Sequence, residues 1–238
     1  MGFCHHKCGT IYLNRVFNDI CIESNVRPVN LDKDDAGLSY SKKFIFFPNG
    51  DYQKHIVETK HTNYKAFHIV RDLRDMIVSG YFSHKYSHAT QNEWGKKFLI
   101  PHRNWLNTVS EEEGIMEEIL KGYALNKISE WNFSDPNIKE IKFEDMIADP
   151  FKTFSEVSDF LQIDVSAEKL KEIIEKNSFE NLSKGRKPGE EDKSSHFRKG
   201  TPGDWKNHFT EEHVKVFKEK WGDLLIKTGY EKDNEWTL

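Results

Sequence analysis

The chain has 238 residues, of which 37% are hydrophobic and 31% charged, and its formal net charge is -4. This length can bury the core of one α/β domain or, at most, of two small ones. A mild acidic balance argues against a nucleic-acid-binding protein, which needs a surface rich in Lys and Arg. We therefore expect a single α/β domain over residues 1–238 and no nucleic-acid partner.

The cysteines and the apolar runs indicate where the protein works. Cys4, Cys8 and Cys21 all lie near the N-terminus, and an odd number of cysteines cannot complete a disulfide framework. No apolar run approaches the roughly 18 residues that a membrane-spanning helix needs, and the N-terminus lacks the pattern of a signal peptide. We predict a cytoplasmic protein without a membrane span.

The first two dozen residues predict a strand, a tight loop and a helix. Residues 2–4 are apolar, residues 5–9 contain Lys7 and a glycine, and the following apolar residues recur at helical spacing. Backbone N–H groups at a helix start attract anions, and Lys7 adds a full charge. The Walker pattern of ATP sites places a hydroxyl after the Lys to hold Mg²⁺, but here Cys8 follows. The pattern favours a metal-free anion site.

Further strands are predicted from apolar or alternating runs at residues 27–31, 43–47, 66–70 and 137–145, with a solvated acidic loop at 32–35. The strand at 66–70 leads directly into Arg71 and a helix at 76–82. Ligands gather at the carboxyl ends of parallel strands, so Lys7 and Arg71 are expected to face one site. The alternative for Arg71 is a surface ion pair with Asp72 or Asp75.

The second half of the chain predicts helices at 111–131, 150–161 and 167–176, and an aromatic-rich loop at 84–108. This loop either binds an acceptor or is an ordinary aromatic surface loop. His84 and His88 are four apart, but no carboxylate or third His at a convincing spacing completes a metal site. Residues 183–196 predict a mobile loop, and residues 197–210 predict a basic flap that closes over an anionic ligand.

Three separated motifs resemble the cytosolic-type sulfotransferases that use 3′-phosphoadenosine 5′-phosphosulfate (PAPS). The family's P-K-S-G-T-T-W loop matches residues 6–12, its R-x-x-[RK]-D-x-x-x-S segment matches residues 71–79, and its R-K-G-x-x-G-D-W-K-N-x-F-T stretch matches residues 198–210 in full. Residues 143–150 are similar to the family's Y-E-D-M-x-x-D-P. The resemblance implies a central parallel sheet flanked by helices, with a P-loop-like strand, loop and helix.

The resemblance also implies roles for individual residues. Lys7 and the neighbouring amides would hold the 5′-phosphosulfate, Arg71 and the basic flap would hold the 3′-phosphate, and aromatic residues would contact the adenine. The implied cofactor-binding residues are Lys7, Cys8, Gly9, Thr10, Ile11, Tyr12, Arg71, Ser79, Phe143, Asn177, Phe179, Phe197, Arg198, Lys199 and Gly200.

The implied catalytic residues are Lys7, which would stabilise charge on the bridging oxygen, and a general base. His61 is the best counterpart of the family's K-T-H histidine, although the first Lys of that motif falls on Thr59. The short gap between His61 and Arg71 leaves Glu58 as an alternative base. Cys8 also departs from the family's loop Ser, and Tyr12 from its usual Trp.

The predicted function is sulfuryl transfer from PAPS to a hydroxyl or amine of a small-molecule acceptor, without a metal. The first alternative is a nucleotide-binding module that has lost catalysis, and the second is a P-loop phosphotransferase that uses ATP and Mg²⁺. Glu211 and Glu212 interrupt the family's dimer motif, so the oligomeric state stays open.

Overall fold

The computed structural model describes residues 1–29, 43–60 and 63–238. The acidic loop predicted at 32–35 and the candidate base His61 lie outside these residues. The chain divides into two compact units. The sheet unit comprises Met1–Arg71 and Lys127–Asn181, and the helical unit comprises Asp72–Asn126 and Leu182–Leu238. That residues 1–238 form one domain stays a prediction.

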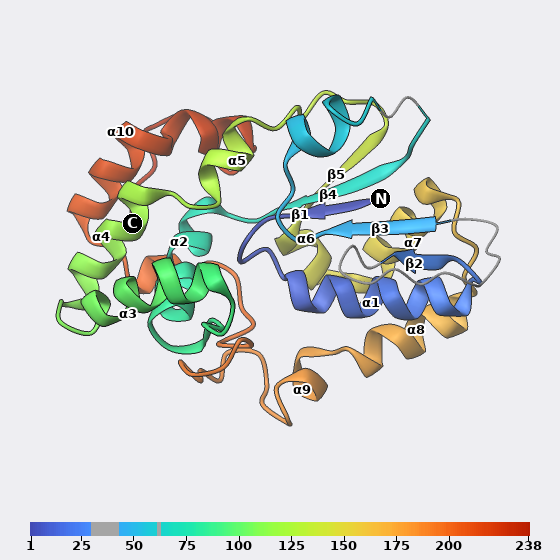
Figure 1. Ribbon diagram of the computed structural model, residues 1–238, viewed down its shortest axis with the longest axis horizontal. Helices are drawn as coiled ribbons and strands as arrows, with labels where there is room; N and C mark the ends of the chain where they lie inside the picture. The colour runs from blue at the N-terminus through green and yellow to red at the C-terminus, as the bar shows by residue number, and fades with distance from the viewer. Residues whose placement is uncertain (30–42, 61–62) are drawn as a thin grey trace. The chain divides into compact units, whose positions relative to one another are not determined.

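The sheet unit is built on five parallel strands in the order β2-β3-β1-β4-β5 (Figure 1). The strands are β1 (Gly2–Cys4), β2 (Arg27–Val29), β3 (Lys43–Phe47), β4 (Ala66–Val70) and β5 (Ile138–Lys142). The predicted α/β class with a central parallel sheet is confirmed. The all-parallel order brings the carboxyl ends of β1, β4 and β5 to one edge, where ligands bind in such sheets.

Aromatic side chains cover both faces of this sheet. Phe17 of a flanking helix stacks on Phe67, with ring centroids 4.4 Å apart, whereas Phe3 stacks on Phe47 at 4.8 Å and meets the edge of Trp131 at 5.2 Å. Successive strand residues point to opposite faces, so two separate cores form. The helices of this unit are α1 (Thr10–Glu23), η1 (Gln53–Val57), α6 (Phe143–Ala148), α7 (Pro150–Leu161) and α8 (Ala167–Lys176). Figure 1 shows α1 and α8 side by side.

The helical unit consists of helices and irregular segments. It contains α2 (Leu73–Phe82), η2 (Ser83–Ser87), η3 (Gly95–Leu99), α3 (Ile100–Leu106), α4 (Glu111–Lys121), η4 (Asp204–Asn207) and α10 (Glu211–Lys227). Two short helices, α5 (Leu125–Ser129) and α9 (Phe179–Leu182), lie where the chain passes between the units. Among the described residues, no helix is both long and apolar enough to cross a bilayer.

Three predicted elements differ from the structure. The strand predicted to reach residue 145 ends at Lys142, because Phe143 begins α6. The helix predicted at 111–131 ends at Lys121, because Gly122 adopts a left-handed backbone (φ 53°) that terminates it. The aromatic-rich segment predicted as a loop is largely helical, but η2 and η3 are π-helical turns. Their wider hydrogen-bond spacing explains the missing 3.6-residue period.

Candidate active site

The loop between β1 and α1, residues 5–9, has the predicted strand-loop-helix geometry. The Cys8 N–H donates to the His5 carbonyl at 3.0 Å and closes a turn. Lys7 (φ 71°) and Gly9 (φ 78°) both adopt left-handed backbone conformations. Alternation of backbone handedness forms a concave nest of N–H groups, and the first turn of α1 adds donors that have no intrahelical acceptor. This β1–α1 loop therefore suits an anion.

Four predicted site residues meet at this loop. The Arg71 guanidinium donates to the Lys7 carbonyl at 3.2 Å and lies 4.8 Å from the centre of the Phe143 ring. A Cβ atom added to Gly9 would lie only 2.9 Å from the Phe143 ring. The structure thus places Lys7, Gly9, Arg71 and Phe143 together at the strand ends of β1, β4 and β5, although what they bind stays a prediction.

Other predicted cofactor residues of the sheet unit take part in internal contacts. The side-chain amide of Asn177 is buried and donates to Asp19 Oδ2 and to the Ile173 carbonyl, each at 2.9 Å. The Tyr12 ring meets the edge of Phe154 at 5.8 Å. Ile11 is exposed, and Phe179 is half-buried at the start of α9. Asn177 and Tyr12 therefore have structural roles, whatever they contribute to binding.

Buried sulfur and hydroxyl groups line the inner side of the β1–α1 loop. The Thr10 hydroxyl lies 3.3 Å from the Cys4 sulfur, at hydrogen-bond distance. The Cys8 thiol is fully buried, and burial raises its pKa to about 12. Cys8 therefore faces the protein interior as a neutral thiol, and the groups of the loop that suit an anion are its backbone N–H groups and Lys7.

In the helical unit, the basic segment predicted as a flap has its cations paired with carboxylates. Arg198 and Lys199 both bond to Asp204, each at 2.5 Å, and the Arg198 guanidinium lies 4.5 Å from the centre of the Phe82 ring. Burial opposes ionisation of Asp204, but hydrogen bonds from His208, Lys199 and other donors outweigh it and hold its pKa well below the usual range. An incoming anion therefore competes with Asp204.

Backbone hydrogen bonds fix the course of this segment. The Asp75 carboxylate accepts the N–H groups of Gly203 and Trp205 at 2.7 and 2.9 Å. Arg186, from the predicted mobile loop, donates to the carbonyls of Phe197 and Arg198 at 2.6 and 3.0 Å. Sequence reasoning did not single out Arg186, since a lone Arg in a polar loop gives no signal of its partner.

Two further predicted residues of the helical unit flank this segment. Gly200 has a left-handed backbone (φ 71°), and Ser79 is half-buried on α2. Trp205 is only 3% exposed and stacks under the Arg74 guanidinium at 4.0 Å. Trp205 therefore packs in the interior of the helical unit.

Comparison with known proteins decides the family. The model of the sulfotransferase domain matches residues 50–229. The chain belongs to the sulfotransferase family. Human sulfotransferase 2A1 is 28% identical over 174 residues, which cover 67% of this chain and 57% of the human protein. Mouse sulfotransferase 2A2 is 30% identical over 175 residues, which cover 66% of this chain and 56% of the mouse protein. The chain thus matches little more than half the length of these relatives.

Solved structures agree on the fold. Mouse sulfotransferase SULT7A1 complexed with PAP superposes with a TM-score of 0.68 and 22% identity, covering 95% of this chain and 87% of that one. Retinol dehydratase in complex with androsterone and inactive cofactor PAP superposes with a TM-score of 0.56 and 19% identity, covering 95% and 80%. At these identities the likeness supports the sulfotransferase fold alone.

Of the two candidate bases of this sulfotransferase, only Glu58 lies among the residues that the structure describes. It is exposed, and its N–H donates to the Gln53 carbonyl at 2.9 Å in the π-helical turn η1. The Thr59 hydroxyl donates to the His55 carbonyl at 2.8 Å. The chain leading to His61 therefore passes through η1 and then a turn at residues 58–60.

The sulfotransferase also contains a carboxylate-imidazole cluster that sequence reasoning missed. Glu118 of α4 is buried, and its Oε1 atom accepts from His84 Nδ1 at 2.8 Å and from His102 Nε2 at 2.9 Å. Burial opposes ionisation of Glu118, but the two imidazoles outweigh it and lower its pKa to about 2. Sequence spacing gave no signal, because the three residues come from three separate elements.

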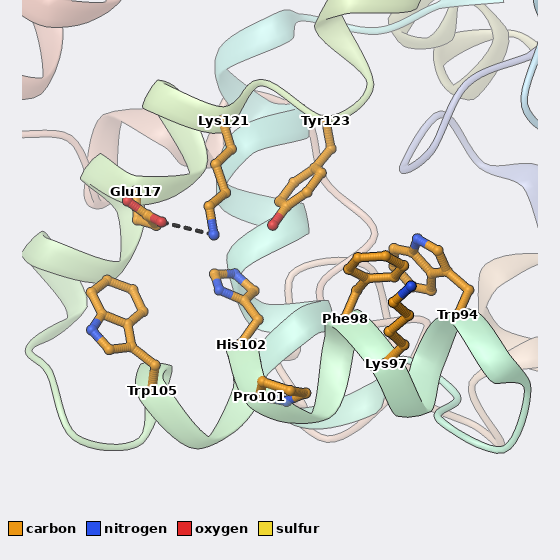
Figure 2. Close-up of a pocket in the computed structure, with 9 residues that line it drawn as sticks. All are labelled: Trp94, Lys97, Phe98, Pro101, His102, Trp105, Glu117, Lys121 and Tyr123. Atoms are coloured by element: carbon orange, nitrogen blue, oxygen red, sulfur yellow. Dashed lines mark ion pairs between the residues drawn. The ribbon is translucent and has the colours of Figure 1, made fainter.

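His102 also lines a pocket of about 480 Å³ in the helical unit (Figure 2). Its walls include the exposed aromatic side chains of Trp94, Phe98, Trp105 and Tyr123. In Figure 2 the Lys121 ammonium lies among these residues, paired with Glu117 at 2.8 Å. Three aromatic residues of the segment 84–108, Trp94, Phe98 and Trp105, thus line this pocket.

Proposed function

We propose that the protein transfers a sulfuryl group from PAPS to a hydroxyl or amine of a small-molecule acceptor and releases adenosine 3′,5′-bisphosphate (PAP). The observation that carries the proposal is the β1–α1 loop, where Lys7 and a nest of backbone N–H groups lie beside Arg71 and Phe143. The family assignment and the PAP named with the similar structures support the same donor.

The proposed reaction is an in-line displacement at sulfur. A bond forms between the acceptor oxygen and sulfur while the bond from sulfur to the bridging oxygen breaks, and the electron pair moves to the 5′-phosphate of PAP. Lys7 and the loop amides are assigned to the growing negative charge on that bridging oxygen. The acceptor proton goes to a general base, for which His61, with Glu58 as its alternative, is proposed from the sequence motif.

From the sequence motifs, the 3′-phosphate is assigned to Arg71, Ser79, Arg198, Lys199 and the Gly200 amide. The adenine is assigned to Tyr12, Phe143 and the segment around Asn177 and Phe179. Asp204 holds Arg198 and Lys199 in place, so a phosphate that binds these cations competes with its carboxylate.

The acceptor is assigned to the aromatic-walled pocket of the helical unit. A volume of about 480 Å³ lies in the range of small-molecule sites, and the walls combine four aromatic side chains with the charged groups of Lys97, Glu117 and Lys121. Androsterone, named in the retinol dehydratase complex, is a molecule of this kind, with a ring system and a hydroxyl. A nucleotide-binding module without catalysis is the second candidate, favoured by Thr59 at the position of the motif's Lys.

The decisive test is the thermal shift of the purified chain with PAP and, separately, with ADP and Mg²⁺. A ligand that binds only the folded state raises the melting temperature. We expect stabilisation by PAP alone, and a smaller shift for Arg198→Ala. Lys215→Ala removes one positive charge from an exposed position on α10 and serves as the matched control. Equal or greater stabilisation by ADP and Mg²⁺, or none by either ligand, contradicts the proposal. Acceptor turnover then separates an enzyme from a binding module.

A further inference from the structure

A buried chain of hydrogen bonds begins at the β1–α1 loop. The Nε2 atom of His5, the first residue of that loop, lies 2.9 Å from His68 Nε2 on β4. On the far side of the same ring, His68 Nδ1 lies 2.6 Å from Glu140 Oε2 on β5. His5 and His68 are 1% and 0% exposed, whereas the Glu140 side chain is 28% exposed. The chain therefore runs from the loop to a carboxyl group that reaches solvent.

Trp131 fixes the geometry of this chain. Its ring stacks on His68, with centroids 4.0 Å apart, and meets the His5 ring edge-on at 5.7 Å. Its indole N–H donates to Glu140 Oε1 at 3.0 Å, which leaves the other carboxyl oxygen for His68. Both imidazoles and the carboxyl group are therefore held in one arrangement, and only the protons between them can move.

The proton on Glu140 determines the direction of every bond in the chain. When Glu140 is ionised, His68 donates through Nδ1 and accepts at Nε2, so His5 must donate through Nε2 and carry a lone pair at Nδ1. When Glu140 is protonated, it donates to His68, His68 donates to His5, and the His5 proton sits on Nδ1. A neutral imidazole has one donor and one acceptor nitrogen, so no mixed arrangement satisfies both contacts.

The surroundings favour a neutral network near physiological pH. Burial raises the pKa of Glu140 to about 8, and the nearby Asp135 carboxylate adds to that effect. Burial lowers the pKa of His68 to about 3. Burial and the neighbouring His68 lower the pKa of His5 well below its usual value, against a smaller opposing effect of Asp51. Asp135 itself accepts from the hydroxyls of Tyr52 and Tyr64. Glu140 is thus the member of the chain that changes charge.

We propose that Glu140 is a positioning residue that acts through His68 on His5, and that its protonation favours anion binding in the β1–α1 loop. The inference rests on the proposed function for the identity of the anion, PAP. Protonated Glu140 leaves the network uncharged and fixes the His5 tautomer. Ionised Glu140 reverses that tautomer and places a negative charge on the central residue of β5, at the other end of the hydrogen-bond chain from the β1–α1 loop, which weakens binding of a phosphate group.

The test is the pH dependence of PAP affinity, measured by titration calorimetry on the whole chain between pH 7.5 and 9.5. For the wild type we expect the dissociation constant to rise about three- to tenfold over this range. Glu140→Gln keeps both hydrogen bonds, because its amide N–H donates to His68, but it cannot ionise. Its affinity should stay tight and vary less with pH. Glu156→Gln, which removes a half-exposed carboxylate of α7, is the matched control and should follow the wild type.

The outcomes separate this inference from the proposed function. If PAP binds but the wild type and Glu140→Gln show the same pH profile, the inference is wrong and the proposed function stands. If no variant binds PAP, the proposed function fails. Nitrogen-15 NMR of the histidines then still tests the network, because the His68 tautomer should change between pH 7 and 9.5 in the wild type and stay fixed in Glu140→Gln. A tautomer that is fixed in both proteins overturns the inference.

Discussion

Replacing Gly9 by Ala tests whether the β1–α1 loop is as tightly specified as its geometry indicates. Gly9 has a left-handed backbone (φ 78°), and an added Cβ would lie 2.9 Å from the Phe143 ring. The left-handed conformation costs an alanine about 1–2 kcal/mol. Displacing a packed ring costs about 1–3 kcal/mol more. We expect Gly9→Ala to lower the stability by about 3 kcal/mol and the melting temperature by about 6–12 °C.

Gly203 provides the control for the backbone part of this cost. It has the same φ of 78°, but an added Cβ would have no neighbour within 4 Å. Gly203→Ala should therefore lose only about 1–2 kcal/mol, or about 2–8 °C, in the same thermal denaturation followed by circular dichroism. Equal losses in the two variants would refute the reasoning, because the contact between Gly9 and Phe143 would then cost nothing. Gly9→Ala should also weaken PAP binding, since Phe143 lies against Arg71.

Two further predictions concern the helical unit. Asp75→Asn removes a charged acceptor from two backbone N–H groups, of which that of Trp205 is buried. We therefore expect the free energy of unfolding to fall by about 2–4 kcal/mol in thermal or urea denaturation, and a loss below about 0.5 kcal/mol would contradict the role of Asp75. Glu118→Gln leaves His84 and His102 without a charged acceptor. We expect the free energy of unfolding to fall by about 3–5 kcal/mol at neutral pH. The pKa of Glu118 is lowered from 4.5 to about 2, so its contribution is present above about pH 4.5 and is lost as the pH falls towards 2. The melting temperatures of wild type and Glu118→Gln should therefore converge in acid, and a gap that is independent of pH would argue against this ion network.

Local patterns in the sequence predicted the sheet and the β1–α1 loop. The strand at 66–70 and the turn around Lys7 and Gly9 are encoded by consecutive residues, whose apolar runs and glycine directly restrict the backbone. The end of the helix at Lys121 was missed, although Gly122 signals it, because apolar residues continue at helical spacing beyond the glycine. A left-handed cap outweighs such a pattern.

Contacts between distant residues could not be predicted in the same way. Glu140 is an ordinary polar residue of an alternating strand, and its proximity to His68 and His5 depends on the order in which three parallel strands pair. Glu118 likewise meets His84 and His102 only after η2, α3 and α4 pack together. Sequence spacing carries no information on such pairs, whereas the family motifs identified Lys7, Arg71 and Phe143 because their spacing along the chain is itself the signal.

The buried thiol in the β1–α1 loop has a practical consequence. Only the thiolate form of cysteine reacts with alkylating reagents. With its pKa raised to about 12, Cys8 is about one part in ten thousand thiolate at pH 8, and its sulfur has no access to reagent while the loop is closed. Cys4 and Cys21 are also buried. Alkylation of Cys8 therefore proceeds through transient opening of the loop. Its rate, measured with and without a ligand, reports how often the loop opens in each state.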